Sequence, residues 1–226
     1  MEALSGLLAL LRDALPWLLR GTGYTLLFAV ASMVLGLMLG ALIAVVRIAR
    51  VPVLSRIAVL YVSCMRGTPL LVQVFVIYYG LPSVGIRFDP ITAGILALTL
   101  NVAAYLSESM RGAVAAIPRG QWNAALSLGL DRRQTMRYVI APQALRVAVP
   151  SLSNSLISLV KDTSLVSVIG VTELMLASKE VISTTFRPLP LYLAAAAIYW
   201  GLSLVFERAQ GGLERRLNRP HEAIAR

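Results

Sequence analysis

The chain has 226 residues, of which 58% are hydrophobic and 14% are charged, and its formal net charge is +10. A soluble domain of this size carries about 45–50% apolar and about 25% charged residues. This excess of apolar residues, which is gathered into long blocks, excludes a soluble enzyme, a nucleic-acid-binding domain and a disordered protein.

Five apolar blocks follow one another along the chain. They cover residues 22–46, 57–79, 90–107, 147–172 and 188–206. A helix needs about 20 largely apolar residues to cross the hydrocarbon core of a bilayer. We therefore predict an all-α polytopic membrane protein with five transmembrane helices, which together occupy residues 21–210. The basic residues lie between the blocks, where they set orientation, and we expect no nucleic acid partner.

The first 20 residues precede the first block and have a helical pattern of their own. The leucines at helical spacing are Leu4, Leu7, Leu8, Leu11, Leu15 and Leu18. We predict a short amphipathic helix over residues 1–20 that lies in the outer interface of the membrane. The alternative is an extension of the first span. Within that span, Gly36 and Gly40 form a G-x-x-x-G pattern, which favours close helix packing or reflects the usual glycine content of membrane helices.

Lysine and arginine are divided unevenly between the two sides of the predicted membrane. One set of alternating segments carries 14 of them and the other carries 5, while Arg66 and Lys161 lie within spans. Cytoplasmic loops carry the excess, which predicts an outside N-terminus and a cytoplasmic C-terminus. The cytoplasmic side then holds a long loop over residues 111–146 and a basic tail over residues 211–226 that contacts anionic lipid headgroups.

Side chains suited to catalysis are scarce. The single cysteine, Cys64, lies in a predicted span, and the single histidine, His221, lies in the tail. The sequence contains no G-x-x-x-x-G-K-[ST] loop, no H-E-x-x-H and no G-x-S-x-G. We therefore expect no catalytic residue, no metal site and no cofactor bound by this chain, so that any energy must come from another chain.

The long loop contains a short amphipathic helix. Trp122, Ala125, Leu126 and Gly129 share one face at positions i, i+3, i+4 and i+7. Pro118 suits the start of this helix and Gly129 suits its end. Its apolar face either docks into a groove of another protein or folds back on the spans of this chain, and the pattern favours neither.

The same loop resembles the EAA signature of ABC importer permeases, in which Glu-Ala-Ala is followed by Gly and later by Ile-x-Leu-Pro. This chain has Asn123-Ala124-Ala125, Gly129 and Ile140-Ala141-Pro142, so that asparagine replaces the glutamate and Ala141 the leucine. Residues 66–73 (R-G-T-P-L-L-V-Q), 104–112 and 161–165 resemble the polar amino acid branch of that family. The resemblance covers about residues 17–217.

The resemblance implies a MetI-like permease fold in the bacterial cytoplasmic (inner) membrane. Such permeases pair as homodimers or heterodimers, bind two cytoplasmic ATPases that hold ATP and Mg, and receive solute from an extracytoplasmic binding protein. The coupling helix would be residues 119–131, and its contacts with the ATPase would be Asn123, Ala124, Ala125 and Gly129. Asparagine offers neutral hydrogen bonds, which are about half as strong as those of a charged group.

Polar side chains at membrane depth usually face a bundle interior or a pathway. Asn101, Tyr105 and Glu108 share one helix face in the third block. The polar stripe of the fourth block comprises Ser151, Asn154, Ser155, Ser158, Lys161 and Asp162. In the second block Pro69 breaks the helix, and broken helices at this depth line cavities in transporters.

These groups form a candidate site for a zwitterionic amino acid. The candidate substrate-binding residues are Thr68, Leu70, Asn101, Tyr105, Glu108, Asp162 and Ser164. The backbone of the break at Thr68–Leu70 would donate to the α-carboxylate of the substrate. Asn101, Glu108 and Asp162 would accept from its α-ammonium group or side chain. Tyr105 and Ser164 would shape the path. The alternative is a set of structural ion pairs, Glu108 with Arg111 and Asp162 with Lys161 or Arg66.

The resulting hypothesis is a permease subunit of an ATP-driven importer for polar amino acids. The alternatives are an ATP-independent secondary amino acid transporter and a wall subunit of a heterodimer that binds no substrate itself.

Overall fold

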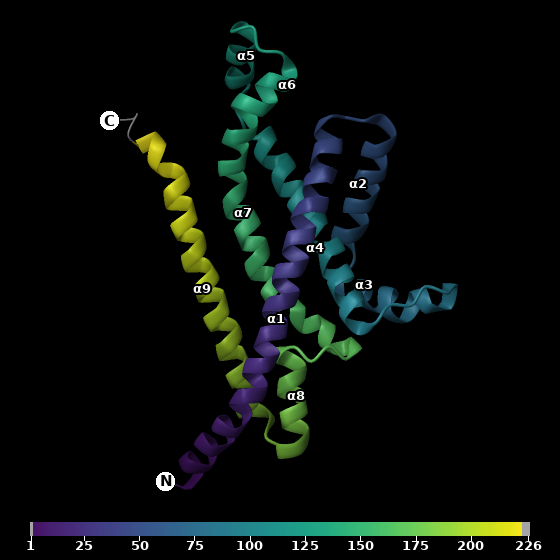
Figure 1. Ribbon diagram of the computed structural model, residues 1–226, viewed down its shortest axis with the longest axis vertical. Coiled ribbons are helices and arrows are strands. Elements are labelled where there is room, and N and C mark those ends of the chain that lie inside the picture. The colour runs from purple at the N-terminus through teal and green to yellow at the C-terminus, as the bar shows by residue number, and fades with distance from the viewer. Residues whose placement is uncertain (1, 223–226) are drawn as a thin grey trace.

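The computed structural model describes residues 2–222, with side chains described for residues 5–216. Every regular element in this range is helical. Figure 1 shows four long helices forming a bundle: α1 (Glu2–Ile48), α4 (Pro90–Ala115), α7 (Ala141–Asp162) and α9 (Pro188–Glu222). The short helix α5 (Arg119–Ser127) lies at one end of the bundle and the N-terminus at the other. These ends are called the α5 end and the N-terminal end below.

Three described helices are long and apolar enough to cross a membrane: Ser5–Ile48, Pro90–Ala115 and Pro188–Arg216. A bent pair, α2 (Pro52–Gly67) followed by Leu70–Val84, raises the number of candidate spans to four. The predicted fourth block forms α7, which is not among these candidates. Its serines, Asn154 and charged residues lower its hydropathy, so composition supports three to four spans rather than five.

The predicted separate helix over residues 1–20 is wrong as an element, because α1 continues without interruption into the first span. Figure 1 shows that α1 bends in its N-terminal part, where Pro16 removes a backbone hydrogen bond. Ala14 and Leu18 are buried against Leu174 of α8 (Leu174–Thr185), whereas Leu15 is exposed. The extension of the first span, which was the alternative, is what the structure has.

Helices α1 and α4 approach closely through the two glycines of the G-x-x-x-G pattern. A Cβ atom added at Gly36 would lie 2.5 Å from Val102 Cγ1, and one at Gly40 would lie 2.9 Å from the carbonyl oxygen of Ala103. The pattern therefore serves helix packing within this chain. Phe28 of α1 and neighbouring α4 side chains form the main hydrophobic core beside this contact.

The second block is broken at the predicted place. Helix α2 ends at Gly67, and α3 (Leu70–Phe75) starts after Pro69 at an angle of 108°. The chain continues as a π-helical turn, η1 (Val76–Gly80), and a 3-10 turn, η2 (Leu81–Val84). Proline has no N–H to donate to the preceding turn, which explains the position of the break.

The predicted central loop folds as α5, the short α6 (Arg132–Gln134) and the π-helical η3 (Thr135–Ile140), which leads directly into α7. Gly129 ends α5 with a φ of +83°, as its sequence position predicts. After α7, the 3-10 helix η4 (Thr163–Ile169) leads to α8 and then to α9. The predicted tail begins inside α9, whereas the side chains of residues 217–226, including His221, lie outside the described residues.

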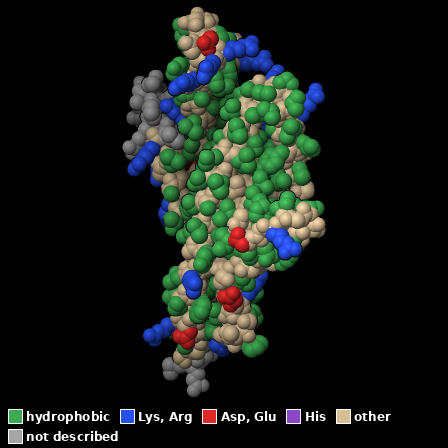
Figure 2. Space-filling view, turned by 45° about the vertical axis from the view of Figure 1, so that its right-hand side comes forward, with side chains coloured by type: hydrophobic (Ala, Val, Ile, Leu, Met, Phe, Trp, Pro, Cys, Tyr) green, Lys and Arg blue, Asp and Glu red, His purple; other side chains and the backbone are tan. Residues whose placement is uncertain are grey.

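The surface has the charge distribution of a protein that crosses a membrane. Figure 2 shows hydrophobic side chains over most of the middle of this face, with many Lys and Arg side chains toward the α5 end. Large hydrophobic side chains in the first span, such as Met38 and Leu42, are more than 60% exposed. Such side chains are compatible with lipid around the middle of the bundle.

Candidate functional site

A cavity of about 570 Å³ opens between the break, α4 and α7. Five of the seven predicted substrate-binding residues line it: Thr68, Leu70, Asn101, Tyr105 and Asp162. The predicted stripe on α7 contributes Ser151, Asn154, Ser155 and Ser158. Pro69, which the prediction placed in the break, also lines the cavity, and the prediction missed three further lining residues, Val102, Ser109 and Leu159. The structure therefore gathers residues from three segments into one polar cavity, as the helix faces predicted.

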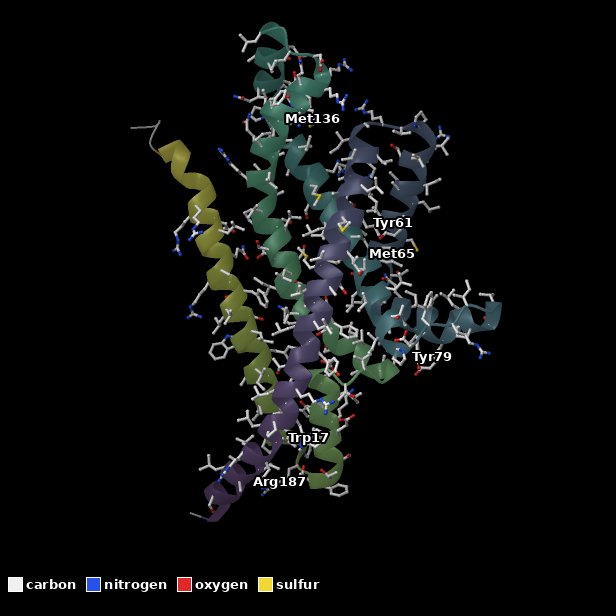
Figure 3. The ribbon with its side chains drawn as sticks, viewed as in Figure 1. Trp17, Tyr61, Met65, Tyr79, Met136 and Arg187 are labelled. Carbon is white, nitrogen blue, oxygen red and sulfur yellow. The ribbon has the colours of Figure 1, made fainter. Side chains whose placement is uncertain are left out.

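The break that forms one wall of this cavity is held by the side chain of Gln73. Its Nε2 atom donates to the carbonyl oxygen of Met65 at 2.9 Å, to that of Thr68 at 3.1 Å and to Thr68 Oγ1 at 2.9 Å. Thr68 Oγ1 in turn donates to the carbonyl oxygen of Cys64 at 2.9 Å. The last carbonyls of α2 lack partners within the helix, and these bonds satisfy those of Cys64 and Met65. Figure 3 marks Met65 on α2 beside α4.

Asn101 is tied to the same break. Its Nδ2 atom donates to Gln73 Oε1 at 3.0 Å and to the carbonyl oxygen of Met65 at 3.3 Å. Sequence reasoning missed the role of Gln73, although a signal was present: it is the one polar side chain in the run Leu70–Ile77. A single polar residue in such a run needs a partner inside the protein.

Glu108 does not line the cavity. Its Oε1 atom pairs with Arg47 of α1, its Oε2 atom lies 2.8 Å from Arg111 Nη2, and Arg66 Nη1 of α2 lies 3.8 Å from Oε2. These four residues are called the Glu108 cluster below. The structure therefore has the predicted alternative, an ion pair with Arg111, and adds two arginines. Glu108 lies at the edge of the cavity-facing side of α4, next to α1, where Arg47 reaches it.

Arg66 is the member of the Glu108 cluster that also contacts a residue of the cavity wall. Its guanidinium carbon is 5.4 Å from the centre of the Tyr105 ring, within the range of a cation–π interaction. Tyr105 also lines the cavity. Arg66 thus contacts both Glu108 and a residue that lines the cavity.

Asp162 is partly buried in the cavity wall. It forms no ion pair with Lys161 or Arg66, although both pairs were predicted as alternatives. Lys161 instead lines a groove against α9, together with Glu207 and Glu214. Ser164, the remaining predicted residue, lies in η4 and does not line the cavity.

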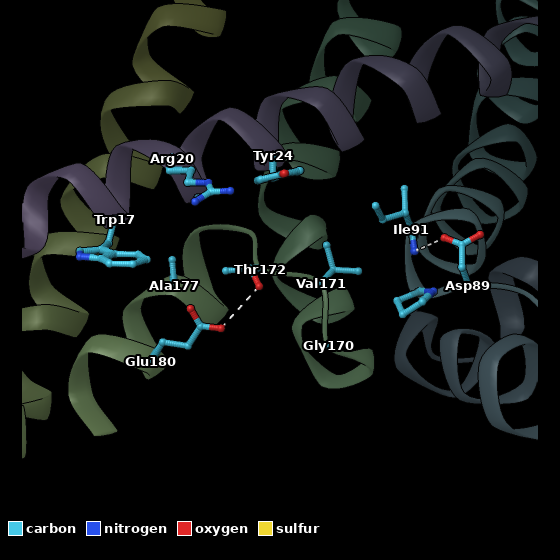
Figure 4. Close-up of a pocket in the computed structure, with 12 residues that line it drawn as sticks. Trp17, Arg20, Tyr24, Asp89, Ile91, Gly170, Val171, Thr172, Ala177 and Glu180 are labelled. Atoms are coloured by element: carbon cyan, nitrogen blue, oxygen red, sulfur yellow. Dashed lines mark hydrogen bonds between the residues drawn. The ribbon is translucent and has the colours of Figure 1, made fainter. Parts of the chain in front are cut away.

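A second cavity of about 560 Å³ lies toward the N-terminal end, between α1, the start of α4 and the turn before α8. Figure 4 shows Trp17, Arg20 and Glu180 around it, with Asp89 at its far side. Asp89 caps α4 by accepting from the backbone N–H groups of residues 91 and 92. These bonds and one from the Thr92 hydroxyl hold the pKa of Asp89 below its usual range. No predicted site residue lines this cavity.

The predicted coupling helix presents two different faces. Ala125 is 3% exposed, and Trp122 on the same helix packs against the hydrophobic cluster that holds Ile140, so this half folds back on the chain itself. Ala125 is thus covered by this chain, and its contact with the ATPase stays a prediction. Asn123, Ala124 and Gly129 are exposed, as the docking interpretation requires. Leu128 beside them is 83% exposed, and this is the open surface of the α5 end.

Comparison with known proteins gives the same architecture. The chain is 42% identical over 212 residues to "Probable amino-acid ABC transporter permease protein PatM" of Vibrio harveyi, covering 92% of this chain and 95% of that protein. It is 40% identical over 206 residues to "Glutamine transport system permease protein GlnP" of Escherichia coli K12, covering 90% and 94%. A solved structure, "Crystal structure of an amino acid ABC transporter with histidines", matches with a TM-score of 0.88 and 35% identity, covering 91% of this chain and 96% of that chain.

Residues 32–219 match the family described as "Binding-protein-dependent transport system inner membrane component". In this family the permease is a multi-pass inner-membrane subunit, and separate ATPase subunits use the ATP. This excludes the alternative of an ATP-independent secondary transporter. The chain belongs to this family, and it is a permease subunit of an ABC importer with the MetI-like fold.

Proposed function

We propose that this permease imports polar amino acids and that they pass through the cavity lined by Asn101 and Asp162. The cavity is the observation that carries this proposal. Its volume of about 570 Å³ accommodates a small solute, and its lining combines amide, hydroxyl and carboxylate groups. Relatives named for glutamine and for amino acids, together with the structure described with histidines, support the same class of substrate.

The cavity supplies one clear partner for each end of an amino acid zwitterion. Asp162 forms no ion pair with Lys161 or Arg66 and lines the cavity, where its carboxylate can accept from an α-ammonium group. On the opposite wall, the backbone around Leu70 begins a new helix, where N–H groups point away from the helix and favour a carboxylate. Tyr105 lies between these walls and limits the width of the path. In this proposal Glu108 and Ser164 do not contact the substrate.

The proposed topology has five spans. The span added to the four candidates is α7, which is the fourth along the chain. A helix with a polar stripe crosses a bilayer when that stripe faces a cavity rather than lipid, and α7 contributes its stripe to the cavity wall. Residues 21–210 then form the transmembrane domain, with the cytoplasmic loop 111–146 and the basic tail 211–226 on the cytoplasmic side. The first turns of α1 lie at the outer interface, where exposed Trp17 suits the headgroup region.

The proposed partners are a cytoplasmic ATPase dimer, an extracytoplasmic binding protein and a second permease subunit. The exposed face of α5, with Asn123, Ala124 and Gly129, contacts the ATPase. When the ATPases close around ATP, α5 moves with them and the bundle turns its cavity outward. The polar lining within this chain supports a substrate site here rather than only in a partner subunit, whichever subunit completes the dimer.

The experiment is a reconstitution of the permease with its ATPase and binding protein. Loaded binding protein is expected to raise the ATPase rate above that with empty binding protein. Asp162→Asn removes the charge proposed to bind the α-ammonium, so the KM for uptake should rise about tenfold or more, while the thermal midpoint of the complex stays near that of the wild type. The proposal fails if Asp162→Asn leaves KM unchanged while the complex transports normally.

A further inference from the structure

The wall of the cavity depends on two side-chain amides that belong to different helices, the buried Gln73 of α3 and the half-buried Asn101 of α4. We propose that Gln73 and Asn101 act as one clamp that holds the break between α2 and α3, so that Asn101 is a positioning residue rather than a direct ligand of the substrate. This inference rests on the proposed function for its transport readout, and on the geometry of the break for its structural readout.

The break creates a need for internal hydrogen-bond donors. At the end of α2, carbonyl groups point toward residues that no longer continue the helix, and Pro69 has no N–H to offer. Unsatisfied carbonyls within a bilayer cost several kcal/mol each, because lipid cannot donate to them. Gln73 and Asn101 together donate to the carbonyl of Met65, and Gln73 also donates to that of Thr68.

The surroundings of Gln73 offer no substitute for its amide. Gln73 is 7% exposed. Behind it lies a smaller cavity of about 230 Å³ whose other lining is hydrophobic apart from Cys64 and Thr68. If the amide were removed, the carbonyl of Thr68 would face this apolar space. The break would then be free to shift into it, and the wall of the substrate cavity would shift as well.

The clamp also determines how Asn101 acts. Both hydrogen bonds that its Nδ2 atom donates go to the break, one to Gln73 Oε1 and one to the carbonyl oxygen of Met65. Loss of Asn101 should therefore weaken the same element as loss of Gln73. Residues that act as a unit give strongly non-additive effects when both are substituted, whereas independent residues give additive ones. A double-mutant cycle distinguishes these two cases.

The chain contains its own reporter of the break. Cys64 is the only cysteine of the sequence, its thiol is exposed, and its carbonyl accepts from Thr68 Oγ1. Its reaction rate with N-ethylmaleimide reports the conformation of the break whether or not transport occurs. Tyr61 provides a matched control, because its hydroxyl donates to the carbonyl of Leu100 and so also joins α2 to α4, about two turns away from the break. Figure 3 places Tyr61 on the same stretch of α2 as Met65.

The experiment compares Gln73→Ala, Gln73→Glu, Asn101→Ala, the double variant Gln73→Ala/Asn101→Ala and Tyr61→Phe in the complex with the ATPase. Uptake of labelled glutamine and histidine gives KM and kcat, and N-ethylmaleimide gives the labelling rate of Cys64. We expect each Gln73 variant and Asn101→Ala to raise KM about tenfold with a smaller change in kcat, and to speed labelling of Cys64. The double variant should differ little from the single ones, and Tyr61→Phe should resemble the wild type.

Gln73→Glu is the sharper of the two Gln73 variants, because a carboxylate of equal size has no N–H for the two carbonyls and should label at least as fast as Gln73→Ala. If Gln73→Ala does not assemble, Gln73→Asn keeps an amide of shorter reach and replaces it in the cycle. Wild-type labelling rates in the Gln73 variants, or additive effects of Gln73→Ala and Asn101→Ala, overturn the clamp. Failure of the wild type to take up either amino acid counts against the proposed substrates, while the Cys64 rates still decide about the clamp.

Discussion

Two polar regions lie on neighbouring turns of α4, and they differ in how their charges are satisfied. In the Glu108 cluster, arginines from α1, α2 and α4 surround one carboxylate. In the cavity, Asp162 has no ion pair with Lys161 or Arg66 and faces open space. Polar residues at similar depth therefore have different roles. The Glu108 cluster joins helices, whereas the cavity is left available to a ligand.

The largest expected effect is on stability and comes from Glu108→Gln. This change leaves Arg47, Arg66 and Arg111 without their shared counter-charge. Breaking a fully buried pair costs about 3–5 kcal/mol, and because this cluster is only partly buried we expect a loss at the lower end of that range, about 3 kcal/mol. Thermal unfolding of the purified permease in detergent measures it. Glu180→Gln, at an exposed carboxylate, is the control and should change stability by less than about 0.5 kcal/mol. Equal melting midpoints for the two variants would show that the cluster does not join the helices.

An intermediate effect is expected from the helix contact that brings Arg47 to Glu108. In Gly40→Ala the new methyl group would lie 2.9 Å from the backbone oxygen of Ala103, which cannot rotate away. We expect a loss of about 1–3 kcal/mol. Gly23→Ala is a matched control in the same helix, because nothing lies within 4 Å of its added Cβ, and it should be neutral or stabilising by up to about 1 kcal/mol. Unfolding midpoints that move together in both variants would contradict the close contact.

The smallest effect is expected from Arg66→Gln, which tests whether the two regions are separate. Arg66 is 45% exposed and 3.8 Å from Glu108, and its other contact is the ring of Tyr105. Loss of both should lower stability by less than about 1 kcal/mol. Uptake kinetics should change less than in Asp162→Asn. A larger rise in KM than in Asp162→Asn would instead show that the cluster and the cavity form one functional unit.

Features with local causes could be predicted from the sequence. Pro69 removes a donor and locates the break, and Gly129 ends α5 because it tolerates a positive φ. The helix period brought Asn101 and Tyr105 to one side of α4, and the stripe on α7 to the facing wall. These predictions needed only the spacing of residues along one helix.

Features that depend on packing between distant helices could not be predicted in the same way. Arg47 and Glu108 are 61 positions apart, and their pairing depends on the close approach of α1 to α4. The apolar pattern of residues 1–20 fits packing on α8 as well as it fits a membrane interface, and the structure has the packing. The resemblance to the EAA signature assigned Ala125 to a partner, whereas its burial within this chain could not be predicted because the face of a short helix does not reveal which neighbour covers it.

The π-helical stretch η3 (Thr135–Ile140) connects the segment that holds α5 to the start of α7. A π-helical turn holds one residue more than an α-helical turn. Loss of that one surplus residue would restore regular winding, whereas any further deletion or an insertion would rotate everything before it by about 100° per residue around the axis of α7. Asn123 and Ala124, the proposed ATPase contacts, would then point in another direction without any change in their own environment. In related permeases this segment should accordingly tolerate exchanges of side chains much better than a change in the number of residues.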